Sequence, residues 1–403
     1  MVYIIETRFN LNRFFLLVVG LWPYKQSRLV QFQINLCSGF LTSFTIFQLT
    51  VFISAECTPD LVIKVLSFAL LLITYSIEYY SFRLNIQVVK YLLEQLQHIN
   101  NKLRDENELA IFKKYGDKAK RFTVIIIILY VFMSTMVGSI TIIPSILGFI
   151  LHINVTQPRV MKQLVPEYFI SHENHFYLIL LYMDIALFIG GTTLVGGGLM
   201  FLSYLTYACG MFRIASYRIE KAIMATKMPI NIDLDKRFDR ENEIIIFKEI
   251  IHAVHMHRKA IKYSLLILRS FQKSRFLLII VMVLCLSLNL YGIAVNTSTI
   301  GDDIEQLLMH FSIATIMFLY LFFINNVGQE IMDHNNHVFF TAYNVQWYIA
   351  PLHIQKVILF LLQRGSKTVS LNFGGVISLS LELFATLLKA SLSYFTVMYS
   401  MQE

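Results

Sequence analysis

The sequence has little charge and few cysteines. Only 15% of its 403 residues are Asp, Glu, Lys or Arg, against about 25% in soluble domains. Its four cysteines include no C-x-x-C pair, which argues against a disulfide framework and against a thiol-based zinc site. We therefore expect free, buried thiols. The sequence also lacks a nucleophile elbow, a Walker loop and a Rossmann glycine pattern, so it gives no sign of an enzyme or of a cofactor site.

Apolar residues and positive charge are in excess. Hydrophobic residues make up 56% of the chain, the mean hydropathy is +0.60 and the net charge is +8. No basic block is interleaved with aromatic residues, so the positive surplus does not indicate a nucleic-acid partner. We interpret the chain as a membrane protein, with its basic residues holding the loops on one side of the bilayer.

Seven stretches are apolar enough to cross a bilayer as helices, which takes about 20 residues each. They lie near 33–54, 61–82, 122–151, 176–207, 276–295, 306–326 and 372–398. The shorter run from Phe14 to Trp22 has no signal-peptide cleavage site after it, and we expect an interfacial or re-entrant helix there. The sequence therefore predicts an all-α, polytopic membrane protein with seven transmembrane helices.

The positive charges also predict the orientation. Nearly all Lys and Arg residues lie in 1–32, 83–121, 209–275 and 327–371, whereas the segments on the opposite side hold only Arg159 and Lys162. Because Lys and Arg are retained in the cytoplasm, we expect a cytoplasmic N-terminus and an extracellular C-terminus. Both glycosylation acceptors, Asn154 and Asn296, then fall outside. This orientation is the reverse of a G-protein-coupled receptor, and a secondary transporter would show an internal repeat that is not found here.

The long inner segments carry apolar residues at helical spacing, for example from Val88 to Ile99 and from Ile244 to Leu265. We expect the transmembrane helices to extend into a cytoplasmic packing domain, with a loop at 222–242. The histidine cluster that includes His257 lacks metal-ligand spacing, and we assign it a structural role.

Side chains in the outer halves of the spans are candidates for an apolar ligand cavity. Asp184 is a candidate polar anchor, since a charge inside a span is costly, whereas Lys64 is expected to reach the surface. Ordinary helix packing is the alternative interpretation of these aromatic and methionine residues. The candidates are Phe68, Leu71, Tyr75, Met133, Met136, Ile140, Tyr177, Leu181, Asp184, Tyr291 and Phe311.

The seventh span carries a continuous polar stripe. Its members lie within about 40° of one line at 100° per residue: Gly375, Ser378, Glu382, Thr386, Lys389, Ser393, Thr396 and Ser400. Such a face cannot contact lipid, so it lies either in the bundle interior or along a pore shared by several subunits. The surplus of acids in the outer segments favours cations at a pore mouth.

Several motifs resemble those of insect odorant receptors. They are Gly328-Gln329-Glu330-Ile331, Thr341-Ala342-Tyr343-Asn344 with Trp347-Tyr348 and Pro351, Ser378-Leu379-Ser380 through Phe384, and Ser391 through Phe395. Gly20-Leu21-Trp22-Pro23 near the N-terminus, and His257 with Ala260, are also similar to that family. The resemblance covers essentially the whole chain.

The resemblance implies a subunit of a tetrameric, odorant-gated, non-selective cation channel. It would be a tuning subunit that binds a small volatile hydrophobic odorant and assembles with the olfactory co-receptor in the dendrite membrane of a sensory neuron. The alternative is a gustatory receptor-type channel, whose usual Thr-Tyr-hydrophobic-x-x-x-Gln-Phe ending is absent here.

The same resemblance implies four regions. Residues 1–32 form a cytoplasmic segment, 33–326 the first six spans with the odorant site, 327–371 a cytoplasmic anchor segment, and 372–403 the pore-lining helix and tail. The implied anchor motif is Tyr343, Trp347 and Tyr348, and the implied gate is Val397, Ser400 and Met401.

Overall fold

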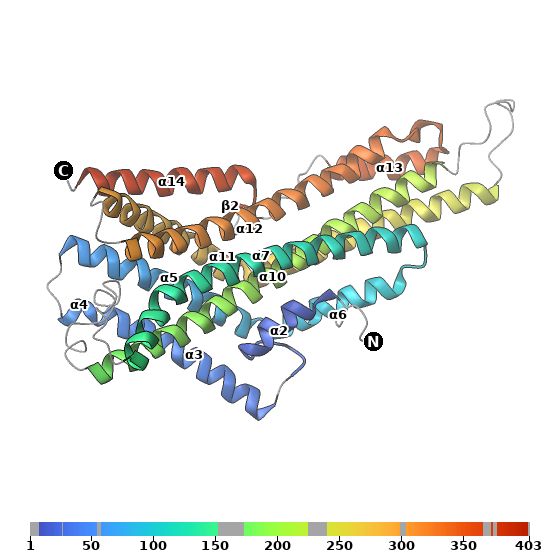
Figure 1. Cartoon of the computed structure of the whole chain (residues 1–403). Helices are drawn as coiled ribbons and strands as arrows, with labels where there is room; N and C mark the ends of the chain where they lie inside the picture. The colour runs from blue at the N-terminus through green and yellow to red at the C-terminus, as the bar shows by residue number, and fades with distance from the viewer. Residues whose placement is uncertain are drawn as a thin grey trace.

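The structure is a computed structural model. It describes residues 8–25, 27–54, 58–151, 173–224, 240–298, 304–365, 372–373 and 377–401. Long helices run side by side in an elongated bundle (Figure 1). The predictions for Asn154 and for most of the 222–242 loop lie outside the described residues.

Seven of the helices are long and apolar enough to cross a membrane, which confirms the predicted all-α, seven-span fold. The elements are α2 (Asn10–Val18), α3 (Arg28–Leu49), α4 (Val51–Ser54), α5 (Pro59–Leu84), α6 (Ile86–Lys102), α7 (Glu106–Leu151), α10 (Glu173–Met224), α11 (Arg240–Ser298), α12 (Ile304–Asn344), the 3-10 turn η1 (Trp347–Ile349), α13 (Leu352–Gly365), β1 (Asn372–Phe373), β2 (Ile377–Ser378) and α14 (Leu381–Ser400).

The N-terminal helix α2 is too short to span a bilayer and packs against α10. Asn12 is buried and donates a hydrogen bond to the Ser203 hydroxyl over 3.3 Å. The chain then reverses at Gly20, whose φ of 77° is one that glycine adopts without steric cost. The Tyr79 hydroxyl bonds the Val19 carbonyl over 3.1 Å. Both ends of α2 are therefore tied to the bundle.

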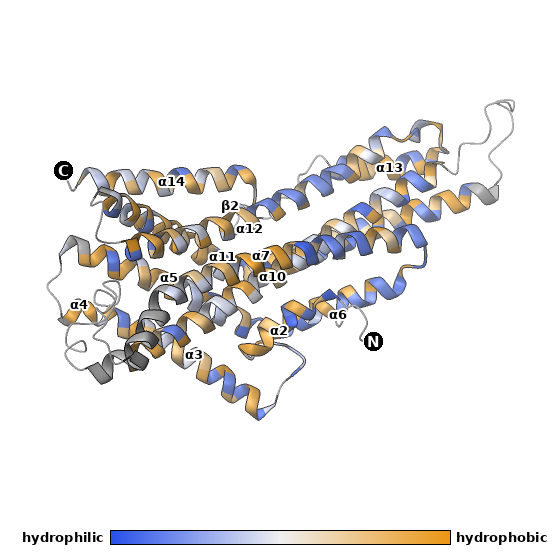
Figure 2. Cartoon of the chain, viewed as in Figure 1, coloured by the Kyte–Doolittle hydropathy of each residue, from blue (hydrophilic) through white to orange (hydrophobic). Residues whose placement is uncertain are grey.

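Four helices, α7, α10, α11 and α12, are far longer than a span needs. They change from apolar to polar toward the end of the bundle where α6 and α13 lie (Figure 2). We call this end, made of α6, α13 and the adjoining parts of those four helices, the anchor end. The predicted extension of the spans into a helical packing region is therefore found there.

Ion pairs and a buried histidine hold the anchor end together. Arg218 forms two hydrogen bonds with Glu108, of 2.6 and 2.8 Å. The Lys221 ammonium bonds the Asp105 carboxylate and holds the pKa of that carboxyl below its ordinary value. His257 is buried and contacts Asn335 over 3.0 Å, which gives it the structural role that the sequence suggested.

The seventh span is shorter than predicted. The helix begins at Leu381, and the two described segments before it, Asn372–Phe373 and Ile377–Ser378, form the antiparallel pair β1 and β2. The Ser380 hydroxyl caps the helix by accepting from the Leu383 N–H over 3.0 Å. Gly375 of the expected stripe lies outside the described residues. The predicted helical start at 372 is therefore wrong, and Ser378 of the expected stripe lies in β2.

Candidate functional site

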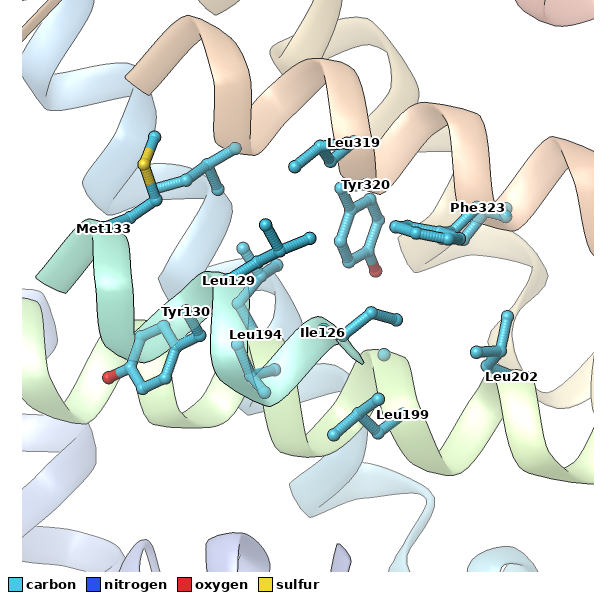
Figure 3. A pocket seen from close by; sticks show the side chains of 14 residues that line it. Ile126, Leu129, Tyr130, Met133, Leu194, Leu199, Leu202, Leu319, Tyr320 and Phe323 are labelled. Carbon is cyan, nitrogen blue, oxygen red and sulfur yellow. The ribbon is translucent and has the colours of Figure 1, made fainter. Parts of the chain in front are cut away.

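An apolar cavity of about 90 Å³ lies between α7, α10 and α12 (Figure 3). A volume of this order holds a small apolar molecule. Its lining residues lie near the middle of α7 and α10 and in the half of α12 that is farther from the anchor end. Its lining residues are Ile126, Leu129, Tyr130, Met133, Leu194, Val195, Gly198, Leu199, Leu202, Ile316, Leu319, Tyr320, Phe323 and Ile324.

Glycines of α10 make room for the two tyrosines that border the cavity. A Cβ on Gly191 would lie 2.9 Å from the Tyr130 ring, and one on Gly198 would lie 3.3 Å from the Tyr320 ring. Gly190 contacts Tyr75 even more closely. The glycine cluster of the fourth span therefore brings aromatic rings close to the α10 backbone, as small residues do between membrane helices.

Both tyrosine hydroxyls of the cavity wall already have partners. The Tyr130 hydroxyl lies 3.4 Å from the Thr192 hydroxyl. The Tyr320 hydroxyl accepts a hydrogen bond from Arg275 and lies 3.4 Å from the Glu78 carboxylate. The other side chains of the wall are apolar, so the described lining offers no uncommitted hydrogen-bonding group.

A buried ion pair lies behind Tyr320. The Arg275 Nη2 donates to Glu78 Oε1 over 2.9 Å, and the two side chains are 2% and 0% exposed. The guanidinium carbon also lies 4.6 Å from the centroid of the Phe201 ring, a cation–π contact that compensates part of the desolvation. The pair joins α5 to α11, and its contact with Tyr320 extends it to α12.

The predicted cavity residues are only partly brought together. Met133 lines the cavity, whereas Phe68, Leu71, Tyr75 and Tyr291 are buried without lining it. Leu181 and Phe311 are more than half exposed on the outside of the single chain. Met136 and Asp184 are half-buried. The side chains of Ile140 and Tyr177 lie outside the described residues.

Glu78, Arg275 and Tyr320 were not among the predicted site residues. A signal was present, because a charge inside an apolar run is expensive unless it is paired. Glu78 falls within the predicted second span, and Arg275 borders the fifth. Their pairing could have been proposed from that observation alone, although their contact with Tyr320 needed the fold.

Helix α14 packs on α11 and α12 through one side only. Leu383, Phe384, Leu387, Leu388 and Met398 face the core. The helical members of the predicted polar stripe, Glu382, Thr386, Lys389, Ser393, Thr396 and Ser400, are all exposed. The stripe therefore does not fill the interior of this chain, which removes one of its two predicted interpretations.

The residues implied as gate and anchor are also on the surface. Val397 is 54% and Met401 82% exposed at the end of α14. Tyr343 and Tyr348 are 67% and 63% exposed beside the half-buried Trp347 at the anchor end. Both groups are available to neighbouring molecules.

A family model described as "7tm Odorant receptor" matches residues 58–392. The chain belongs to the odorant receptor family. It is thus a multi-pass membrane receptor and not an enzyme, in agreement with the seven apolar helices. The family match also decides against the gustatory alternative as the kind of receptor.

Solved structures confirm the fold of this odorant receptor. The insect olfactory receptor OR5 from Machilis hrabei in complex with eugenol is similar, with a TM-score of 0.77 and 13% identity over 98% of each chain. The structure of the same receptor described without eugenol gives a TM-score of 0.74 and 14% identity over 96% of each chain.

Proposed function

We propose that this receptor is the tuning subunit of an odorant-gated, non-selective cation channel. It assembles with olfactory co-receptor subunits into a tetramer in the dendrite membrane of a sensory neuron. The observation that carries the proposal is the polar stripe of α14, which is exposed along the described helix while the opposite side packs on the bundle. A membrane helix with such a face needs either water or another subunit beside it.

The cavity between α7, α10 and α12 is the proposed odorant site. Its apolar wall and small volume suit a volatile hydrophobic molecule, whose free energy falls when it leaves water. We propose that the predicted outer residues, among them Tyr75 and Asp184, border an extension of this site. Asp184→Asn then shifts the concentration of odorant that gives half the maximal response, whereas an unchanged response would assign Asp184 to packing.

The proposed orientation places the anchor end in the cytoplasm and Glu403 outside. Its support is the concentration of Lys and Arg in the segments of the anchor end. A tag fused after Glu403 should be labelled on intact cells, and a tag before Met1 only after permeabilisation. The reverse labelling pattern would contradict both the orientation and the shared pore.

The decisive measurement is odorant-evoked current from cells that express this receptor together with the co-receptor. We expect a cation current with both chains, and a current with a different odorant preference when another receptor replaces this one. Glu382→Gln, which removes one acid from the α14 stripe, should reduce cation preference in the same cells. Silence toward a broad odorant panel, despite surface expression of both chains, would contradict the proposed function.

A further inference from the structure

The buried network behind the cavity connects three helices through one tyrosine. Arg275 of α11 donates to Glu78 of α5 and to the hydroxyl of Tyr320 of α12. The same hydroxyl also lies 3.4 Å from the second Glu78 oxygen. Tyr320 is therefore held at its hydroxyl by two charged groups, while its ring forms part of the cavity wall (Figure 3).

Glycines of α10 and two phenylalanine rings pack closely against this network. A Cβ on Gly197 would lie 2.5 Å from Glu78 Oε1, and Gly198, the next residue, contacts the Tyr320 ring. The guanidinium of Arg275 also lies against Phe201 and Phe271. The hydrogen bonds at its hydroxyl and the close contact of its ring with Gly198 leave the tyrosine little freedom to turn its hydroxyl toward a ligand.

The commitment of this hydroxyl has a consequence for ligand chemistry. Hydrogen bonds to charged groups are stronger than those between neutral groups, so a neutral odorant competes poorly with Glu78 and Arg275 for Tyr320. A ligand carbonyl that enters the cavity then loses its water without gaining a partner, at a cost in affinity. A hydrocarbon of the same shape carries no such cost.

We propose that Glu78 and Arg275 are positioning residues that withdraw the Tyr320 hydroxyl from the cavity and thereby select hydrocarbon-like odorants over odorants that need a hydrogen bond. The inference rests on the proposed function, because it takes the cavity as the odorant site. It adds a chemical class of ligand and assigns a role to an ion pair that contacts no ligand itself.

Matched ligands test this selection. Butylbenzene and butyrophenone share one carbon skeleton and differ by a ketone oxygen, and nonane with 2-nonanone forms a second pair. The measured quantity is the ratio of half-maximal concentrations, ketone over hydrocarbon, for current through the receptor–co-receptor complex. In the natural receptor this ratio should exceed one.

The double variant E78M/R275M removes both charges together, so no unpaired charge stays buried, and unbranched methionines adapt to the remaining space. The Tyr320 hydroxyl then loses its partners and can donate to the ketone. We expect the ratio to fall about tenfold, the effect of one hydrogen bond of ordinary strength. Adding Tyr320→Phe to the double variant should restore the original ratio.

The control is a second interhelical ion pair, the partly exposed Lys118 with Glu330, whose atoms lie 2.7 Å apart at the anchor end. K118M/E330M should leave the ratio unchanged. An unchanged ratio in E78M/R275M, or a fall that persists when Tyr320→Phe is added, would overturn the inference.

A single variant covers the case in which the double variant does not reach the surface. Tyr320→Phe alone keeps the ring and should not raise the ratio, because the hydroxyl is already committed. A raised ratio in this variant would mean that the hydroxyl bonds the ligand in the natural receptor, which contradicts the inference. Absence of current from the natural receptor with any odorant would instead contradict the proposed function.

Discussion

The fifth and seventh spans, α11 and α14, are opposites in their surroundings. The most apolar window of α11 is 67% buried within the chain, whereas that of α14 is 6% buried. Helix α11 contacts α5, α10, α12 and α14, but α14 has its main contacts only with α11 and α12 (Figure 1). The chain thus supplies the surroundings of α11 and leaves most of α14 uncovered.

This difference separates two kinds of residue. Side chains on α11 stabilise the fold of the single chain, because their partners lie in the same molecule. Side chains on the exposed side of α14 contact what surrounds the chain, which we propose is a pore and neighbouring subunits. Substitutions should therefore lower the stability of the chain most in α11 and least at the outer end of α14.

Arg275→Ala should have the largest effect on stability. It leaves the Glu78 carboxylate buried without its partner, and breaking a buried pair costs about 3–5 kcal/mol. We expect a lower temperature of unfolding for the detergent-purified complex and less receptor at the cell surface. Arg269→Ala, an exposed arginine on the same helix, should change stability by less than about 0.5 kcal/mol. Equal losses of stability in the two variants would show that burial of the arginine does not determine the size of the loss.

Gly328→Ala should come second, because it acts where the seventh span joins the bundle. A Cβ at Gly328 would lie 2.3 Å from the Leu379 Cβ and 2.8 Å from the Leu379 carbonyl oxygen. Overpacking of this kind costs about 1–3 kcal/mol, and we expect α14 to shift and the odorant-evoked current to fall. Gly39→Ala is the matched control, since a Cβ there meets nothing within 4 Å. A normal current from Gly328→Ala would show that the position of α14 does not depend on this contact.

The fold could be predicted well from the sequence, because the hydropathy of a segment indicates whether it is surrounded by water or by lipid. The seven apolar runs are helices in the structure, and the inner segments with helical periodicity form the anchor end. Sequence reasoning missed the start of α14, where apolar residues such as Phe373 form the β1–β2 pair instead of a helix. Composition alone does not distinguish these two outcomes for a short apolar run.

The cavity was much harder to predict. Its wall combines Tyr130, Leu199 and Tyr320 from three helices, and their rotation relative to one another depends on close contacts such as Gly198 with Tyr320. Depth in the membrane selected aromatic residues such as Phe68 and Tyr291, which pack in the core. Among the predicted residues whose side chains the structure describes, only Met133 also lines the cavity.

Ser380→Ala should lower stability less than Arg275→Ala or Gly328→Ala does. It removes the hydroxyl that caps the first turn of α14, and such a loss costs about 1 kcal/mol. The backbone N–H of Ser380, which bonds Asn325 over 3.3 Å, is unaffected. We expect a modest fall in current amplitude with unchanged odorant preference. Ser380→Asn keeps a capping side chain and should behave like the natural receptor; similar losses in both variants would exclude capping as the cause.

Val397→Ala and Met401→Ala should hardly change stability, because both side chains are more than half exposed in the single chain. Their proposed place is an apolar ring that closes the pore by excluding water, so a smaller side chain should raise the current that flows without odorant. Leu392→Ala, at a position of α14 that is 51% exposed and lies outside the implied gate, is the control and should leave the resting current unchanged. If resting current and conductance stay the same in both gate variants at equal surface expression, the constriction lies elsewhere on α14. A loss of folded protein in either variant would contradict the contrast between α14 and α11 itself.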